Sequence, residues 1–206
     1  MIWFTADNHF SHANCIRFCH RPFQTADQMD AAMIRNWNEV VRPEDTVYII
    51  GDFIWRGGKG YKKRIIDQLS GNKILILGNH DGKTDQPHSY LGMGYKEVYS
   101  HHTTLAITGQ EVLLCHYPYN PNMTAWQLLV YRLKNFWKFW RRDKYPFFKH
   151  IEKRPADEGK WLLCGHIHDH WKFKGKQINV GVDVNDFYPV SIDEIAKIIG
   201  GTDAKD

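Results

Sequence analysis

Five short blocks of His, Asp and Asn residues, each directly after an apolar run, constrain this chain more than any other feature. The runs are short and mostly β-favouring, as expected for strands buried on both faces: Ile2–Ala6, Val47–Ile50, Ile74–Leu77, Val112–Cys115 and Trp161–Cys164. The blocks are Asp7-Asn8-His9, Gly51-Asp52, Gly78-Asn79-His80-Asp81, Cys115-His116 and Gly165-His166-Ile167-His168. Ligand sites in open α/β sheets form at the carboxyl ends of strands. Five such strands side by side are therefore expected to bring these groups into one cleft.

The residue types in the blocks predict a metal centre. Imidazole nitrogens with carboxylate or amide oxygens suit Mn, Fe, Co, Ni or Zn, whereas an all-oxygen set indicates Mg or Ca. The candidate ligands outnumber those that one ion uses: Asp7, His9, Asp52, Asn79, His116, His166 and His168. Two ions are therefore predicted, bridged by Asp52 at about 3.5–4 Å. The x-spaced pairs Asp7/His9 and His166/His168 fit alternate residues of an extended segment, which point the same way.

Each block taken alone also has an ordinary structural reading. Asp-x-His is a weak motif, Gly-Asp is a common turn, and a single strand-terminal His is more often a hydrogen-bonded core residue than a ligand. The block Gly165-His166-Ile167-His168 is less ordinary, because no packing rule asks for two imidazoles there. It is the occurrence of five blocks in this order that favours a catalytic site.

The order Asp-x-His, Gly-Asp, Gly-Asn-His-Asp, His, Gly-His-x-His resembles that of the calcineurin-like metallophosphoesterases, from Met1 to about Ile192. The small bacterial and phage-type members are similar in three further stretches: His9–Asn14, Asn36–Glu39 and Pro43–Tyr48. The resemblance implies an α/β fold, a four-layer α-β-β-α sandwich of two mixed β-sheets flanked by helices. It also implies a two-metal-ion phosphoesterase that hydrolyses a phosphodiester or a phosphomonoester.

The resemblance further implies a role for each block. One ion would be held by Asp7, His9, Asp52 and His168, and the other by Asp52, Asn79, His116 and His166. The catalytic residues would be His80 and its partner Asp81. A metal-bridging hydroxide would attack phosphorus in line, while His80 protonates the leaving oxygen as general acid. Manganese is the favoured ion, with iron, zinc, nickel and cobalt as alternatives.

Substrate contacts and the substrate itself are less constrained. His12 and Arg56 are candidates for phosphate binding, against an ordinary reading as solvated side chains. A phosphodiester is slightly preferred over a monoester, because His80 can assist a poor leaving group. Two alternatives stay open: a nuclease acting on nucleic-acid phosphodiesters, and a non-catalytic metal- or phosphate-binding scaffold of the same fold.

Composition sets broad limits. The 206 residues are expected to form one domain over 1–206, and a net charge of +4 is far from that of a dedicated nucleic-acid binder. No disulfide framework is indicated by the four cysteines Cys15, Cys19, Cys115 and Cys164. A half zinc site at Cys15-x3-Cys19-His20 is disfavoured, because no second Cys pair follows. We expect a cytoplasmic protein without a leader or a transmembrane segment.

Helices and a hairpin are expected between the blocks. Thr25 is expected to cap a helix that ends at Arg42-Pro43, and a short helix is expected over Tyr61–Leu69. Residues Thr103–Thr108 and Gln110–Cys115 are expected to form a hairpin around Gly109. Ser191 and Glu194 form a capping-box pattern at the start of a final helix.

A helical basic and aromatic insertion is expected at about 118–159. Trp126, Leu129, Val130, Leu133, Trp137 and Trp140 share one helical face, and Lys134, Lys138, Arg141 and Arg142 lie outside it. The simpler interpretation of 124–142 is a lid or outer helix packed on this protein's own core or on a second subunit, in a homodimer. The alternative is peripheral contact with an anionic membrane. A nuclease would use the same residues to bind nucleic acid.

Overall fold

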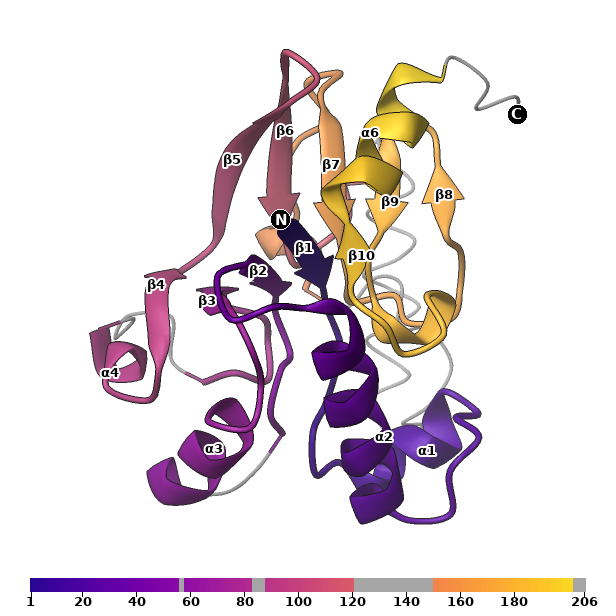
Figure 1. Ribbon diagram of the computed structural model, residues 1–206. Coiled ribbons are helices and arrows are strands. Elements are labelled where there is room, and N and C mark those ends of the chain that lie inside the picture. Colours follow the sequence, from indigo (N-terminus) through magenta and orange to yellow (C-terminus); the bar gives the residue numbers. More distant parts are fainter. Residues whose placement is uncertain (56–57, 83–87, 121–149, 202–206) are drawn as a thin grey trace.

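Two five-stranded β-sheets form the centre of the molecule in the computed structural model, which describes residues 1–55, 58–82, 88–120 and 150–201 (Figure 1). The first sheet has the order β10-β1-β2-β3-β4. Four of its strands run parallel: β1 (Ile2–Thr5), β2 (Thr46–Ile50), β3 (Asn72–Ile76) and β4 (Tyr95–Tyr99). The edge strand β10 (Val190–Ser191) is antiparallel to β1.

The second sheet has the order β5-β6-β7-β9-β8. An antiparallel hairpin of β5 (His102–Ile107) and β6 (Gln110–Cys115) turns at Gly109, as predicted. The next strands, β7 (Trp161–Cys164) and β9 (Gln177–Asn179), run parallel to β6, and β8 (Phe173–Lys174) is antiparallel to β9. Both sheets are therefore mixed, and the predicted α/β fold class is confirmed.

All five apolar runs are strands, but they do not lie side by side in one sheet. β1, β2 and β3 belong to the first sheet, whereas β6 and β7 belong to the second. The segments that follow these strands are nevertheless in contact across the two sheets. The His166 backbone N–H donates to Asp7 Oδ2 at 2.7 Å, and the His116 ring Nδ1 lies 2.9 Å from the Ile50 carbonyl oxygen. Convergence of the blocks thus comes from two sheets, not one.

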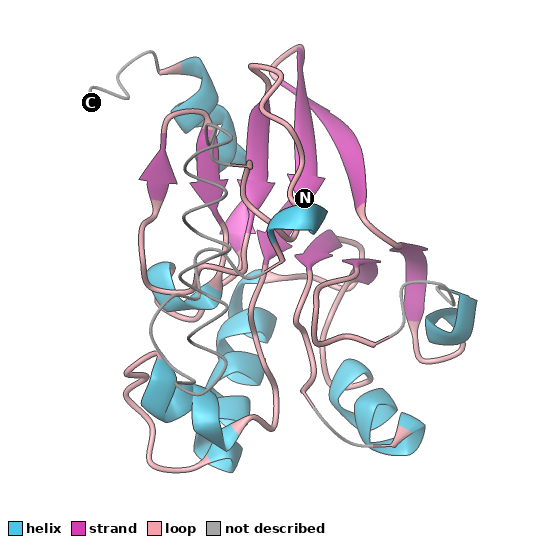
Figure 2. Cartoon of the chain, turned by 180° about the vertical axis from the view of Figure 1, so that it is seen from behind, coloured by secondary structure: helices cyan, strands magenta, loops and turns pink. Residues whose placement is uncertain are grey.

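Three helices lie at one end of the molecule, away from the β5–β6 turn: α1 (Ala13–Phe18), α2 (Ala26–Val40) and α3 (Lys59–Ile66) (Figures 1 and 2). The other helical segments lie elsewhere: α4 (His88–Leu91), α6 (Ile192–Gly200) and the 3-10 turns η3 (Ile151–Lys153) and η4 (Val182–Val184). The predicted Thr25 cap of α2 and the capping box of α6 are confirmed. The helix expected over Tyr61–Leu69 instead begins and ends earlier, as α3.

Side chains of β2 alternate between two cores, which is what locks the layers together. Val47 and Ile49 are fully buried against α2 and α3, in a cluster that includes Trp37. Ile50 points the other way, into a second cluster that contains Leu163 of the opposite sheet. A fully buried side chain of this size contributes about 1.5–3 kcal/mol relative to an exposed one. Because alternate side chains of β2 are buried in different cores, the register of β2 is fixed, and so is the position of the block that follows it.

The outer face of the second sheet carries a third cluster, which includes Cys115, Tyr117, Leu162 and Cys164.

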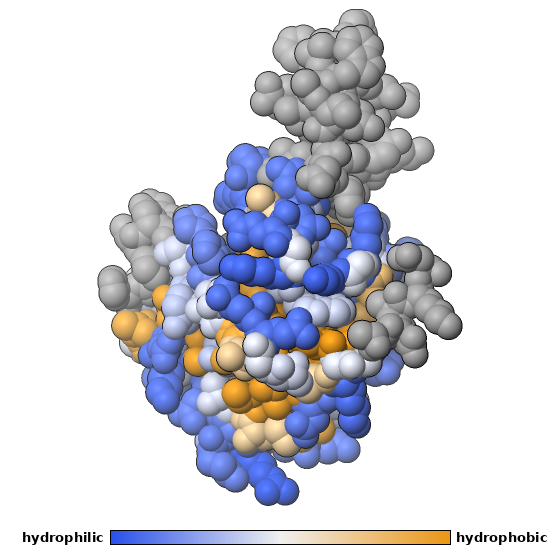
Figure 3. Space-filling view, turned by 90° about the horizontal axis from the view of Figure 1, so that it is seen from above, coloured by the Kyte–Doolittle hydropathy of each residue, from blue (hydrophilic) through white to orange (hydrophobic). Residues whose placement is uncertain are grey.

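Most of the predicted insertion, and the whole of the helix at 124–142, lies outside the described residues. In the part of the chain that is described, no helix is long and apolar enough to cross a membrane. Seen from above, much of this face is hydrophilic, with apolar side chains near its centre (Figure 3).

Asp45 joins three elements at the amino end of β2. Its carboxylate accepts hydrogen bonds from the Met1 amino group at 2.7 Å, the Trp3 indole Nε1 at 3.0 Å and the Arg42 N–H at 2.9 Å. Its carbonyl accepts the Asn72 N–H at 2.7 Å. The Arg42 amide, followed by the amino group, lowers the pKa of Asp45 to about 2. The carboxylate thus fastens the start of β1 to the turn before β2, and the backbone carbonyl fastens β3 to the same turn.

We predict that Asp45→Asn lowers the free energy of unfolding by about 1–3 kcal/mol at pH 7, because charge-assisted hydrogen bonds are lost. Since the folded pKa lies below the ordinary value, the carboxylate stabilises the fold fully above about pH 4 and loses this effect as the pH falls through about 2. Urea unfolding at pH 7 and pH 3 measures both effects. A difference between wild type and variant that does not shrink at pH 3 would contradict the assignment.

Candidate metal centre

The predicted ligands lie just beyond the strand ends, and five of the seven adopt left-handed backbone conformations. The φ angles are 55° at Asp7, 49° at His9, 54° at Asp52, 71° at His166 and 49° at His168. The expectation that the x-spaced pairs lie in extended segments is therefore wrong, since β1 ends at Thr5 and β7 ends at Cys164. Such conformations cost free energy in residues other than glycine and cluster at functional sites.

Asp52 lies at the centre of the cluster. Its Oδ2 lies 3.4 Å from His116 Nε2, 3.6 Å from His9 Nε2 and 4.0 Å from His80 Nε2. Its Oδ1 accepts the His80 N–H at 2.7 Å. Asp52 is 2% exposed. One buried carboxylate therefore faces histidines that follow strands of both sheets.

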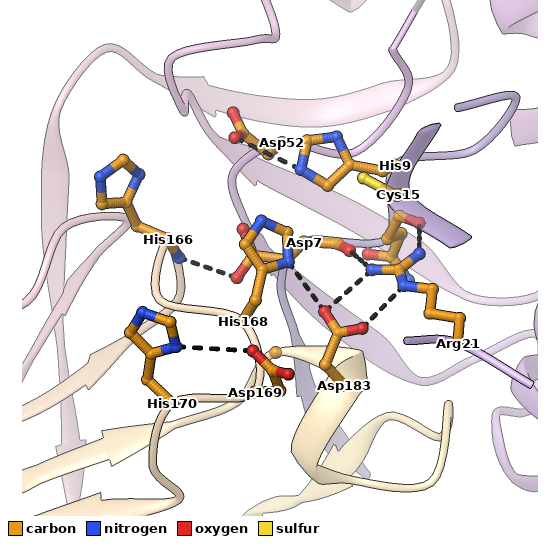
Figure 4. Close-up of polar contacts among 12 residues, drawn as sticks. Asp7, His9, Cys15, Arg21, Asp52, His166, His168, Asp169, His170 and Asp183 are labelled. Carbon is orange, nitrogen blue, oxygen red and sulfur yellow. Dashed lines mark hydrogen bonds and ion pairs between the residues drawn. The ribbon is translucent and has the colours of Figure 1, made fainter. Parts of the chain in front are cut away.

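The other predicted ligands lie on either side of Asp52. Ligand atoms of Asp7, His9 and His168 lie within 4.8 Å of one another (Figure 4). Those of Asp7, Asp52 and His116 do so as well. Asn79 Oδ1 lies 3.2 Å from His116 Nε2. The ring centroids of His166 and His116 lie 5.2 Å apart. The backbone N–H of His166 donates to Asp7 Oδ2 at 2.7 Å.

Several of these ligand atoms are buried without a hydrogen-bond partner. Among the described residues they include Asp7 Oδ1, both ring nitrogens of His9 and His166 Nε2. Leaving a buried polar atom unsatisfied costs about 1–3 kcal/mol, so native proteins rarely do it without a reason. A divalent ion would accept electron pairs from these atoms, and the mixed nitrogen and oxygen set suits a transition metal. The residues therefore fit a metal centre.

Comparison with known proteins agrees with this geometry. The profile of the calcineurin-like phosphoesterase family matches residues 1–178. The chain belongs to this family. Its members act on phosphate esters and bind divalent metals. This membership confirms the family that the order of the five blocks indicated.

Relatives match over most of the chain. The uncharacterized protein MJ1445 of Methanocaldococcus jannaschii is 31% identical over 96% of this chain and 90% of its own length. The gene 66 protein of Mycobacterium phage L5 is 30% identical over 88% of this chain and 86% of its own length. A solved structure, the protein of unknown function AQ665 from Aquifex aeolicus, is 28% identical with a TM-score of 0.64, covering 96% of this chain and 98% of that one.

Electrostatics separates the histidines of the candidate metal centre into two groups. Burial lowers the pKa of His9 and of His166 well below the ordinary value, which keeps both imidazoles neutral. Neutral imidazole is the form that binds metal ions. Burial also opposes the charge on His116, but the nearby Asp52 carboxylate raises the pKa of His116 to about 9. The same contact holds the pKa of Asp52 far below its usual range, despite burial.

Two glycines of the blocks allow the ligands to approach the backbone. A Cβ atom at position 78 would lie 2.3 Å from Asp52 Oδ1. A Cβ atom at position 165 would lie 2.6 Å from both the Ala6 Cβ and Asp7 Oδ2. The space that Gly78 and Gly165 leave open is therefore the space that the carboxylates occupy.

The remaining candidates lie at different places. Asp81 accepts the backbone N–H groups of Asp52 (2.7 Å), Phe53 (2.8 Å) and Gly78 (2.8 Å), which supports a structural role. Its pairing with His80 stays a prediction. His12 is 8% exposed, is stacked on Trp55 with ring centroids 3.9 Å apart, and has Nδ1 2.9 Å from Cys15 Sγ. Arg56 lies outside the described residues.

Sequence reasoning missed two buried residues behind the site, Arg21 and Asp183. Asp183 lies 2.8 Å from His168 Nδ1 and 2.7 Å from Arg21 Nε. A signal for Asp183 existed, because the segment Val180-Gly181-Val182-Asp183 follows β9 as Gly51-Asp52 follows β2. Arg21 carries no comparable local pattern.

We predict that Gly165→Ala removes metal binding on one side of the centre, because the new methyl group would displace Asp7 Oδ2. Metal content of the purified variant is to be measured by mass spectrometry, with circular dichroism to verify folding. Gly92→Ala is a matched control, because Gly92, like Gly165, lies outside the left-handed φ region, and a Cβ atom at position 92 meets nothing within 4 Å. Normal metal content in Gly165→Ala would exclude this steric account.

Proposed function

We propose that the chain is a two-metal-ion phosphoesterase that hydrolyses a phosphodiester or a phosphomonoester. The observation that carries this proposal is the set of buried, unpartnered ligand atoms gathered around Asp52. Family membership gives the reaction class, since calcineurin-like phosphoesterases cleave phosphate esters. The geometry adds which side chains of this chain would perform it.

Two sets of ligands share Asp52 in this proposal. Asp7, His9 and His168 would hold one ion with Asp52, and Asn79, His116 and His166 would hold the other with it. When bound, two such ions polarise phosphate oxygens, neutralise developing charge and lower the pKa of attacking water. The buried atoms of Asp7, His9 and His166 that lack hydrogen-bond partners support ligand roles for these three residues. Manganese is the proposed ion.

His80 is proposed as the general acid. Its side chain is 30% exposed, whereas the neighbouring Asp52 side chain is 2% exposed. Its backbone N–H is held by Asp52, and its ring lies edge-on to Trp55 with centroids 4.4 Å apart. An imidazole has an ordinary pKa of about 6.5 and so can donate a proton near neutral pH. His80 is thus held beside the ligands and is accessible to a leaving oxygen.

The first test of this proposal removes the shared carboxylate charge. The purified wild-type chain should hold about two transition-metal ions. Asp52→Asn should lose at least one ion and at least about 100-fold in hydrolysis of bis-nitrophenyl phosphate. Asp45→Asn, which removes a buried carboxylate at the other end of β2, is the control and should keep both ions. Full activity of chelated wild type would refute the two-metal reading, and inactivity of the loaded protein on every ester would favour a scaffold.

The second test separates proton donation from metal binding. His80→Ala should keep both ions and slow hydrolysis by about 10²–10⁴-fold for esters with basic leaving groups, with a much smaller effect on nitrophenyl esters. Rates over a series of leaving groups, with metal content measured in parallel, give the comparison. Equal slowing across the series would remove His80 from the acid role, and loss of an ion would make it a ligand.

The substrate class is a further part of the proposal. We keep the slight preference for phosphodiesters, because a donor such as His80 benefits poor leaving groups most. The nuclease alternative depends on residues 124–142, which lie outside the described ranges. Assays of the manganese-loaded chain against phosphomonoesters, small diesters, cyclic nucleotides, DNA and RNA distinguish these possibilities.

A further inference from the structure

Arg21 and Asp183 form a buried ion pair behind the proposed metal centre. Arg21 Nε donates to Asp183 Oδ1 at 2.7 Å, and Arg21 Nη2 donates to Asp183 Oδ2 at 2.9 Å. The two side chains are 0% and 1% exposed. Removing two charges from water costs several kcal/mol per ion, so a buried pair is weak evidence for stability. Its position beside the ligands suggests a different reason for its presence.

Two of the three remaining N–H groups of Arg21 donate to the segment that carries Asp7 and His9, and the third donates to Met29 of α2. Nη2 donates to the Asp7 carbonyl at 2.7 Å, and Nη1 donates to the Asn8 carbonyl at 2.9 Å and to Met29 Sδ at 3.3 Å. All five N–H groups of the guanidinium are therefore used. They hold the backbone where Asp7 and His9 adopt φ angles of 55° and 49°. A lysine ammonium lacks the planar fork that makes this set of contacts.

Asp183 continues the network to the third ligand. Its Oδ2 lies 2.8 Å from His168 Nδ1, as the dashed line in Figure 4 shows. When Nδ1 donates this bond, Nε2 is left with its lone pair for a metal ion. The loop is held from a second side, because Asn179 Nδ2 donates to the His168 carbonyl at 2.8 Å. The pair thus contacts the segments or side chains of Asp7, His9 and His168 together.

We propose that Arg21 and Asp183 are positioning residues for one of the two metal ions, the ion held by Asp7, His9 and His168. Asp183 sets the tautomer and ring orientation of His168, and Arg21 fixes both the Asp183 carboxylate and the strained Asp7–His9 segment. Neither residue touches substrate. This inference rests on the proposed two-metal function and adds that the affinity of one ion depends on a pair outside the ligand set.

A direct ligand role for Asp183 is the main competing explanation. Cys19 Sγ and ligand atoms of His168 and Asp183 also lie within 4.8 Å of one another. An ion at that place would make Asp183 a ligand. The His168 ring would then use Nδ1, not Nε2, for that ion. The two explanations differ in how many ions the chain binds and in what Cys19→Ser does.

The experiment measures binding of Mn²⁺ to the full chain by equilibrium dialysis, with Co²⁺ absorption as a second readout. In Asp183→Asn, one of the two ions should bind about 10–100-fold more weakly and the other within about twofold of wild type, the size expected when a metal-bound histidine loses its hydrogen-bond partner. Arg21→Lys, which keeps the charge, should weaken the same ion less. In both variants the Co²⁺ spectrum should change.

Two control variants make the result specific. Asp45→Asn loses a buried, multiply hydrogen-bonded carboxylate away from the ligands, so it should be destabilised yet bind both ions normally. Cys19→Ser should also keep both ions. If Asp183→Asn does not fold, Arg21→Lys and Asp183→Glu provide the same comparison, with Asp183→Glu expected to recover part of the affinity.

Three results would overturn the inference. One is wild-type affinity for both ions in folded Asp183→Asn and Arg21→Lys. Another is equal weakening of both ions in those variants and in Asp45→Asn, which would mean general destabilisation. The last is a third ion in wild type that is lost in both Asp183→Asn and Cys19→Ser. Failure of wild type to bind two ions would instead refute the proposed function itself.

Discussion

The buried Asp52 carboxylate is the interaction on which the rest of the site depends. An ionised carboxylate that is 2% exposed is costly unless charged or hydrogen-bonding groups surround it. Here the compensation comes from both sheets: His9 follows β1, His116 follows β6, and the His80 N–H binds Oδ1. Residues that follow strands of both sheets therefore surround the Asp52 carboxylate, and the apolar core between the sheets holds these residues in place.

Backbone strain around Asp52 is offset by hydrogen bonds from outside the ligand set. Left-handed conformations at Asp7, His9, Asp52, His166 and His168 are unfavourable one by one. The Asp81 carboxylate joins the segment after β2 to the segment after β3, because it accepts three backbone N–H groups from them. Arg21 donates to two backbone carbonyls in the segment after β1. These buried polar residues help to explain how five candidate ligands in strained conformations keep one arrangement. The Cβ contacts at Gly78 and Gly165 show how little space remains around them.

Much of the fold and site could be predicted because the signals are local. Apolar runs of four or five residues gave β1, β2, β3, β6 and β7, and side-chain caps gave the starts of α2 and α6. The ligand residue types followed from metal chemistry. The expectation that Asp7/His9 and His166/His168 lie in extended segments is wrong, however, because these residues follow the ends of β1 and β7. The pairing of Asp81 with His80 stays a prediction, and the structure adds that the Asp81 carboxylate accepts three backbone N–H groups.

By itself, the sequence determined which segments are strands, which residue types could bind metal, and the family to which the chain belongs. Only the tertiary structure decided that the blocks meet across two sheets and that Arg21 and Asp183, 162 positions apart, form an ion pair beside the Asp7 backbone and the His168 ring. The physical reason is that hydrophobic period and capping are properties of a few neighbouring residues. Which distant loops share a buried polar site depends instead on how two sheets pack face to face, and on which charges can then find partners away from water.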